Sequence, residues 1–348
     1  MSMDRIGAYN KRSKYKFSFE KPQYSLQLSL IHFRVMSKVI AVAGGSGGLG
    51  RAIVDVLKGD NRYKTVILGR KTNLDLEKEI GVPILEAEYS DPDALIQLLE
   101  KHKIDTIIST FGFMNFDPTP EFNLITAAEK SSVTNRIIPS IWSGYEFKPE
   151  HRESSPIAAL KLSLLERMSK TSLEWTAIYP GLFLDYYTPD IKTHINRAAL
   201  ILDVDGNAAG IPGSGTYPVH FTHTTDIAKY TVAVLGLKKW DTKYFIAGET
   251  KSWKELVAIV EKVKGVKLNV AFDSIEKLER GEVTELPGHT KMYEAFGGAA
   301  SKPLLQSMMA RSGIWMNEGL GQFKGAAFLN EMFPEIKAMR LGNGVTGS

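Results

Sequence analysis

The sequence contains no cysteine among its 348 residues. A disulfide framework, a thiolate nucleophile and a metal centre held by cysteine sulfur are therefore excluded. The apolar runs are also too short for a membrane-spanning helix, which needs about 20 predominantly apolar residues. The absence of cysteine fits a reducing compartment, and we expect a cytoplasmic protein that does not bind membranes.

Acidic and basic residues nearly balance once the first 35 residues are set aside. The whole chain has a formal charge of +4, and residues 1–35 contribute +5 of it, so residues 36–348 carry about −1. We therefore expect no binding of nucleic acid by that part. Residues 1–36 are interpreted as a basic leader outside the fold: a disordered arm, a mitochondrial targeting segment, or a stretch upstream of a translation start at Met36.

The sequence has no hydrolase motif in a suitable context. The His-Glu-x-x-His motif of zinc proteases does not occur, and the one Gly-x-Ser-x-Gly match, Gly44–Gly48, is part of a glycine-rich turn. His220 and His223 lie close together in the sequence, but no further residues follow at metal-ligand spacing. We expect no metal site.

What the chain does contain is a glycine-rich turn between a predicted strand, Val39–Ala43, and a predicted helix. Gly44, Gly47 and Gly50 are three residues apart, which suits a tight turn, close approach to a pyrophosphate and close packing of helix on strand. The helix N-terminus adds N–H groups for the phosphates. The segment predicts a dinucleotide site formed by Gly44, Gly45, Ser46, Gly47, Gly48, Leu49 and Gly50.

The end of the next predicted strand, Thr65–Gly69, favours NADP(H) over NAD(H). Proteins that bind NAD commonly place an acidic residue there, for the ribose 2′-hydroxyl. This chain has Arg70 and Lys71 instead, and a guanidinium group binds a 2′-phosphate through paired hydrogen bonds. The alternative is that both are solvated loop charges. We expect them to bind the 2′-phosphate of NADPH.

Strands and helices alternate along residues 37–182. Further strands are predicted at Pro83–Ala87, Ile104–Ser109, Arg136–Ser140 and Glu174–Tyr179, with helices between them. This alternation predicts an α/β fold with a doubly wound parallel sheet of the Rossmann type.

Residues 183–341 have a looser pattern. We expect a smaller, mostly helical substrate-binding region there, interleaved with the last strands of the core. The particular expectations are a helix over Asp190–Ala198, a turn region over Gly206–Gly215, a helix capped by Thr225 and Asp226, and a helix from Ser252 to Lys264. Residues 342–348 are predicted to be a disordered tail.

One lysine lies within an apolar stripe. In the helix predicted from Pro156 to about Lys170, Lys161 is one turn from Ile157 and one turn from Leu165. An inward lysine reaches solvent, pairs or serves a site, and the periodicity leaves a structural and a functional role open.

The topology favours the functional role. Ligands of such sheets lie beyond the carboxyl ends of the strands. Ser140 ends the fifth predicted strand, and Tyr145 follows it in a loop. We therefore select Lys161, Ser140 and Tyr145 as candidate catalytic residues, with Lys161 donating the proton or orienting a water that donates it, and Tyr145 assisting.

Together these segments resemble the NmrA-like and isoflavone-reductase-like branch of the atypical short-chain dehydrogenases. The resemblance covers residues 38 to about 265. It is carried by the glycine turn, Arg70, R-I-I-P-S (Arg136–Ser140), Lys161 with L-S-L-L-E-R-M after it, E-W-T-A-I-Y-P-G-L-F (Glu174–Phe183) and H-T-T-D-I-A-K-Y (His223–Tyr230).

The resemblance implies an NADPH-dependent reductase in which Lys161 is the active-site lysine and lies at the cofactor. It also implies that Thr110, Phe111 and Gly112 lie along the cofactor.

The chain departs from the family pattern at two places. Ile157 takes the position of the tyrosine in the Tyr-x-x-x-Lys pair of typical short-chain dehydrogenases. Residues 141–144 replace the Glu-Phe-Gly of many family reductases, which argues against aromatic ether and isoflavone substrates. In overall style the chain resembles fungal members of specialised-metabolite pathways, which reduce ketones or cyclic imines.

Three functions follow as hypotheses. The first is reduction of a C=O or C=N bond of a small molecule by NADPH. The second is an NADP-sensing regulator without chemistry, and the third is a redox-neutral cyclase or isomerase on the same fold. The sequence identifies neither the substrate nor the oligomeric state.

Overall fold

A six-stranded parallel sheet forms the centre of residues 37–182, in which the sequence predicts nucleotide binding and which we call the nucleotide-binding half. The structure, a computed structural model, describes residues 37–112, 116–325 and 327–344, so the predicted leader lies outside the described residues. The strand order is β3-β2-β1-β4-β5-β6, and every neighbouring pair is parallel. The strands are β1 (Lys38–Ala43), β2 (Tyr63–Gly69), β3 (Ile84–Glu86), β4 (Ile104–Ser109), β5 (Arg136–Ile138) and β6 (Glu174–Trp175). The chain winds outward from β1 and then returns to its other side, so the predicted doubly wound sheet is confirmed.

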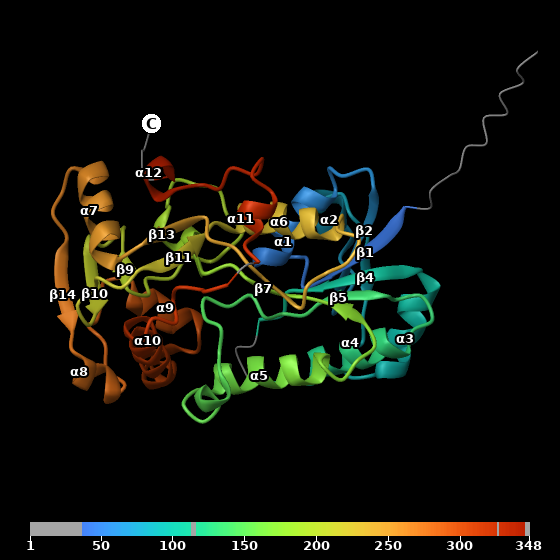
Figure 1. Cartoon of the computed structure of the whole chain (residues 1–348), viewed down its shortest axis with the longest axis horizontal. Helices are drawn as coiled ribbons and strands as arrows, with labels where there is room; N and C mark the ends of the chain where they lie inside the picture. The colour runs from blue at the N-terminus through green and yellow to red at the C-terminus, as the bar shows by residue number, and fades with distance from the viewer. Residues whose placement is uncertain (1–36, 113–115, 326, 345–348) are drawn as a thin grey trace, which may run out of the picture. The chain divides into compact units, whose positions relative to one another are not determined.

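Helices cover both faces of this sheet (Figure 1). Side chains alternate along β1: Ile40 and Val42 pack with α1 and α6, and Ala41 and Ala43 pack with α3, α4 and α5. Both faces of a parallel sheet are buried in this way, which explains its nearly continuous apolar strands. The helices are α1 (Gly48–Leu57), α2 (Leu74–Ile80), α3 (Pro92–Lys101), α4 (Thr119–Lys130), α5 (Pro156–Met168) and α6 (Thr224–Leu235).

The sixth predicted strand is divided at Thr176. Its first part, β6, pairs with β5, whereas β7 (Ala177–Tyr179) pairs in parallel with β12 (Lys243–Phe245). A strand from late in the chain therefore joins the nucleotide-binding half. Residues from 37 onward form one compact unit.

The region after residue 182 contains two small sheets in addition to the predicted helices. Two three-stranded sheets form there, with orders β14-β10-β9 and β13-β11-β8. The strands are β8 (Leu182–Phe183), β9 (Leu202–Asp203), β10 (Ala208–Pro212), β11 (Val219–Thr222), β13 (Glu249–Lys251) and β14 (Asn269–Asp273). The helical elements are η2 (Leu184–Tyr187), α7 (Trp253–Lys264), α8 (Ile275–Glu279), α9 (His289–Ala295), η3 (Gly298–Ser301), α10 (Lys302–Asn317), α11 (Leu329–Met332) and α12 (Leu341–Gly344).

Two local predictions in this region are wrong because tertiary contacts decide the backbone. The segment Asp190–Ala198 is not helical: Thr193 bonds Asp185, and the His194 ring bonds Asp55 of α1 at 2.8 Å. The predicted turn region Gly206–Gly215 contains β10, which is wholly buried beside β14. Contacts distant in sequence are invisible to local periodicity.

Helix ends follow local signals more closely. α7 begins after Ser252 as predicted, in a capping box in which Ser252 and Glu255 bond each other's backbone N–H. The cap of α6 differs from the prediction, since the His223 ring accepts a hydrogen bond from the N–H of Thr225. The tail predicted as disordered from residue 342 begins within α12, where Leu341 is fully buried.

Candidate functional site

A cavity of about 680 Å³ opens beyond the carboxyl ends of the central strands. Its wall combines nine of the residues predicted from sequence with apolar side chains from the region after residue 182. The predicted residues are Gly47, Gly48, Leu49, Thr110, Phe111, Gly112, Ser140, Tyr145 and Lys161. The remaining predicted residues, Gly44, Gly45, Ser46, Gly50, Arg70 and Lys71, do not line it.

The glycine turn has no room for a side chain at its ends, whereas its tip is open. Gly44 has φ +79°, in the region that favours glycine, and a Cβ on Gly50 would lie 2.4 Å from both the Gly44 carbonyl oxygen and Thr110 Oγ1. At the tip, a Cβ on Gly47 would have no atom within 4 Å. Gly44 and Gly50 therefore build the turn, while Gly47 leaves an open face.

That open face lies at the N-terminus of α1. Gly47 is the N-cap residue and supplies no side-chain cap, and the first turn contains no acidic residue. Unpaired N–H groups at such a helix end favour anions. The arrangement fits the phosphates of a dinucleotide.

Thr110 links the end of β4 to this turn. Its hydroxyl donates to the Ala43 carbonyl oxygen at 2.7 Å, and its side chain packs where Cβ atoms on Gly44 or Gly50 would lie. Gly44, Gly50 and Thr110 thus pack directly against one another.

Arg70 and Lys71 are exposed directly after β2 ends. The other basic residue near the turn, Arg51, is engaged: its guanidinium bonds Asp55 at 3.3 Å and Glu79 at 3.4 Å. Binding of a 2′-phosphate by Arg70 and Lys71 stays a prediction.

Lys161 is buried on α5, as its place in the apolar stripe predicts. Its side chain contributes to the cavity wall, and Nζ donates to the Ser140 carbonyl oxygen at 2.5 Å. Burial lowers the pKa of this amine to about 7, and the charge of Glu121 acts in the opposite direction. An amine with a pKa near neutrality can donate or accept a proton under physiological conditions.

Sequence reasoning missed Glu121, a fully buried carboxyl in the first turn of α4. It accepts hydrogen bonds from the Ser109 hydroxyl and from the Ser140 N–H at 3.0 Å. Burial raises the pKa of this carboxyl, and the two donors and Lys161 oppose the rise. A signal was present, because Glu121 shares its helix face with Leu124 and Ile125, three and four residues later.

The other two candidate catalytic residues differ in how they face the cavity. The Ser140 hydroxyl donates to the Phe111 carbonyl oxygen at 2.9 Å. The Tyr145 hydroxyl bonds the Ser312 hydroxyl of α10, and burial raises the pKa of this phenol. The structure thus brings Lys161 and Ser140 into contact and directs the Tyr145 hydroxyl to α10.

Aromatic and methionine side chains form the rest of the cavity. Trp142, which donates from its indole N–H to the Ser109 carbonyl oxygen at 2.7 Å, lies on the wall of the nucleotide-binding half. α10 supplies much of the opposite wall, and none of the described lining residues is acidic. The lining residues of α10 are Leu305, Met308, Met309, Ser312, Trp315 and Met316.

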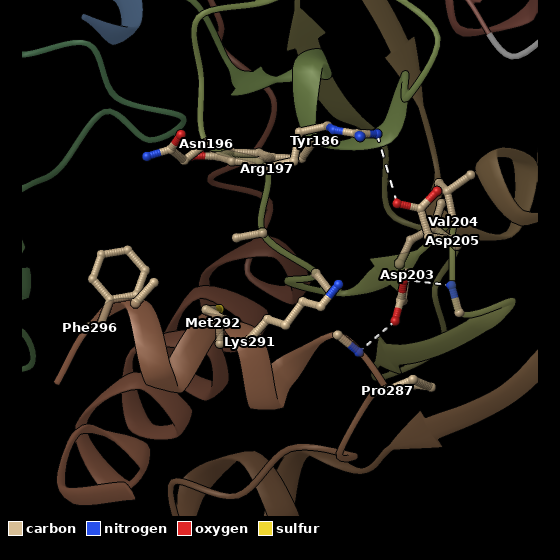
Figure 2. Close-up of a pocket in the computed structure, with 16 residues that line it drawn as sticks. Tyr186, Asn196, Arg197, Asp203, Val204, Asp205, Pro287, Lys291, Met292 and Phe296 are labelled. Carbon is tan, nitrogen blue, oxygen red and sulfur yellow. Dashed lines mark hydrogen bonds and ion pairs between the residues drawn. The ribbon is translucent and has the colours of Figure 1, made fainter. Parts of the chain in front are cut away.

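A second cavity of about 420 Å³ adjoins the first (Figure 2). The two share Tyr186, Asn196, Ala198, Met292 and Phe296. One charged group of the second cavity, Asp203, serves the fold. The Asp203 carboxylate accepts from the Gly206 N–H at 2.8 Å and the Gly288 N–H at 2.7 Å, and so joins the turn after β9 to the start of α9.

Within the described ranges, no group of three or more histidine, aspartate or glutamate side chains is placed to hold a metal ion. The His220 ring bonds the Thr250 hydroxyl at 2.8 Å, while His223 caps α6. The helices in the same part of the chain are too short or too polar to cross a membrane.

Comparisons with known proteins agree with this architecture. The model of the NmrA-like family matches residues 36–310. Oxidoreductase BOA1 of Botryotinia fuckeliana is 31% identical over 302 residues, which is 85% of this chain and 95% of the relative. Oxidoreductase swnN of Metarhizium robertsii is 26% identical and covers 86% of this chain and 94% of its own.

Among solved structures, the binary complex of leucoanthocyanidin reductase with NADPH from Vitis vinifera superposes with a TM-score of 0.67. The superposition covers 88% of this chain and 98% of the reductase. At 16% identity it shows that the two proteins share a fold. The family match spans most of the chain, including the glycine turn and Lys161. The chain therefore belongs to the NmrA-like family.

Proposed function

We propose that this oxidoreductase is an NADPH-dependent reductase that transfers a hydride to the C=O or C=N carbon of a small, apolar or heterocyclic molecule. The carrying observation is Lys161, a buried amine with a pKa of about 7 on the wall of a cavity that extends from the glycine turn to an apolar chamber. The relatives named oxidoreductases and the fold shared with an NADPH complex support the same function.

The described residues fit such a cofactor. The open N-terminus of α1 would bind the pyrophosphate, and Arg70 would bind the 2′-phosphate. NADPH, when bound, supplies the hydride. Lys161 in its ammonium form donates a proton to the oxygen or nitrogen of the acceptor, so that the carbon gains the hydride and the heteroatom gains the proton. The apolar wall holds the substrate and excludes water, which strengthens this electrostatic contact.

The direct test measures NADPH oxidation with a panel of ketones and cyclic imines, as expected for an intermediate of specialised metabolism. We expect turnover with at least one neutral, ring-containing compound. If NADPH binds but no compound oxidises it, the regulator hypothesis gains. Product formation without consumption of NADPH would favour the redox-neutral cyclase or isomerase.

The cofactor preference depends on the exposed guanidinium after β2. For Arg70→Ala we expect the Kd of NADPH to rise by about tenfold or more, since a charge-assisted hydrogen bond contributes about 1.5–3 kcal/mol. The Kd of NADH stays the same. Arg62→Ala is the control, because Arg62 precedes β2 at the other end of the strand and pairs with Asp60. An unchanged NADPH/NADH ratio would assign the 2′-phosphate to other residues.

Tyr145→Phe tests the second proton-donor candidate. Because its hydroxyl bonds Ser312, we expect kcat to fall by no more than about tenfold, the scale of one neutral hydrogen bond. Ser312→Ala breaks the same bond and is expected to match it. A loss of roughly 10²–10⁴-fold, confined to Tyr145→Phe, would identify Tyr145 as the donor in place of Lys161.

A further inference from the structure

Glu121 and Lys161 are buried on neighbouring helices, α4 and α5, and both contact Ser140. The Ser140 N–H donates to Glu121 Oε1 at 3.0 Å, and the Ser140 carbonyl oxygen accepts from Lys161 Nζ at 2.5 Å. The backbone of Ser140, two residues after β5, thus carries both contacts. Movement of the carboxylate would move the group to which the amine binds.

The hydrogen bonds of Glu121 favour its ionised form. A backbone N–H only donates, so the Oε1 atom facing Ser140 acts as an acceptor. The second oxygen bonds the Ser109 hydroxyl at the end of β4. Both hydrogen bonds oppose the effect of burial, which raises the pKa of this carboxyl.

We propose that Glu121 is a positioning residue for Lys161, which holds the Ser140 backbone under the amine and favours the ammonium form through its negative charge. The catalytic consequence rests on the proposed reductase function; the effect on the amine does not. Burial alone disfavours a charged lysine at this wall, and a nearby carboxylate opposes that effect. The pair thereby keeps a proton available inside an apolar cavity.

Other titratable groups around Lys161 do not replace this carboxylate. Tyr145, Tyr186 and Tyr187 line the same cavity, and burial raises the pKa of each phenol, so all three are neutral near pH 7. Two further titratable groups on the elements packed against α5 have their own partners. These are Glu129 of α4, bonded to Arg167 at 3.0 Å, and His151 of η1 (Pro149–His151), whose ring accepts from the Lys148 N–H at 2.9 Å.

The decisive experiment is a pH titration of the lysine side chains by NMR on the full chain without cofactor. Lysine is labelled with ¹³C at Cε, and Lys161→Met assigns the Lys161 signal. In the wild type we expect a midpoint near pH 7. In Glu121→Gln, which keeps an acceptor for the Ser140 N–H but loses the charge, we expect the midpoint to fall by about one pH unit.

Asp273→Asn provides the matched control, since Asp273 is also a buried carboxylate and pairs with Lys277 at 2.6 Å on α8. It removes the same charge from a different pair, so the Lys161 midpoint is expected to stay at its wild-type value. The proposal would be overturned if thermal unfolding showed that Glu121→Gln is folded and its Lys161 signal titrated with the wild-type midpoint. An equal shift in Asp273→Asn would overturn it as well.

Activity provides a second and separate readout. With a substrate that the enzyme reduces, Glu121→Gln is expected to move the alkaline limb of the pH profile of kcat to lower pH, by the same amount as the Lys161 midpoint. Glu121→Asp restores the charge and is expected to return the limb towards the wild-type position. Turnover with an unmoved limb and an unmoved titration contradicts the role of Glu121. A moved titration with no NADPH oxidation contradicts the reductase and leaves the role of Glu121 supported.

Discussion

Lys161→Met is expected to abolish most turnover while leaving the fold and the affinity for NADPH close to the wild type. Loss of a general acid typically costs roughly 10²–10⁴-fold in rate, so kcat should fall by that amount. Methionine has a similar length and suits the apolar stripe of α5, and it removes the cost of burying an amine. The measurements are steady-state NADPH oxidation, calorimetric binding of NADPH and thermal unfolding.

The role of Lys161 as proton donor also predicts the direction in which kcat changes with pH. Lys161 donates its proton as the ammonium ion, and burial lowers its pKa from the ordinary value of 10.5 to about 7. The wild-type kcat should therefore be highest below pH 7 and fall as the pH rises through that value. Lys161→Met should lack this limb in its residual activity.

Lys170→Met is the control for loss of a lysine near the same helix. Lys170 is exposed and bonds Glu166, so both the rate and the pH profile should be those of the wild type. Turnover by Lys161→Met at the wild-type rate, with an intact alkaline limb, would remove Lys161 from the mechanism.

Gly50→Ala is expected to cause the second large effect, because it damages both the fold and the cofactor site. The added Cβ would lie 2.4 Å from the Gly44 carbonyl oxygen and from Thr110 Oγ1. Neither the backbone of the turn nor the Thr110 side chain, which bonds Ala43, can move without opening the β1–α1 junction. We expect a loss of about 1–3 kcal/mol in unfolding free energy, the usual cost of overpacking, together with loss of measurable NADPH binding.

Gly47→Ala separates binding from folding. Its backbone has φ −156°, which any residue adopts, and the new Cβ has no neighbour within 4 Å. Stability should therefore stay unchanged, whereas the methyl group obstructs the open face at the N-terminus of α1 and NADPH affinity falls. Gly59→Ala, where a Cβ would be 3.5 Å from the Val56 carbonyl oxygen, should change neither quantity. Unchanged NADPH affinity in Gly47→Ala would place the pyrophosphate away from this turn.

The nucleotide-binding half could be predicted because its signals are local. The apolar run of β1, the glycine spacing and the stripe of α1 lie within twenty residues, and each has one physical interpretation. No helix is predicted between the strands Thr65–Gly69 and Pro83–Ala87, yet α2 forms there, capped by Asn73 and ended by Gly81 in the left-handed region. Its short length gives too little periodicity for recognition.

The second half could not be predicted to the same degree. β10 gains its structure from β14, some sixty residues later in the chain, and the segment around Thr193 is held by Asp185 and by α1. Such contacts leave no period in the sequence. The inward position of Lys161 was predicted from a 3.6-residue repeat, and the same argument applied to α4 would have selected Glu121.

The sequence by itself determined the parallel Rossmann-type sheet, the glycine turn at β1–α1 and the burial of Lys161, because strand alternation, glycine spacing and helical periodicity are properties of neighbouring residues. Only the tertiary structure decided that Lys161 binds the Ser140 carbonyl oxygen, that Glu121 lies behind the same residue and that α10 closes the apolar wall. Those contacts join α4, α5, the end of β5 and α10, and their distances depend on how the helices pack on the sheet, which no local pattern specifies.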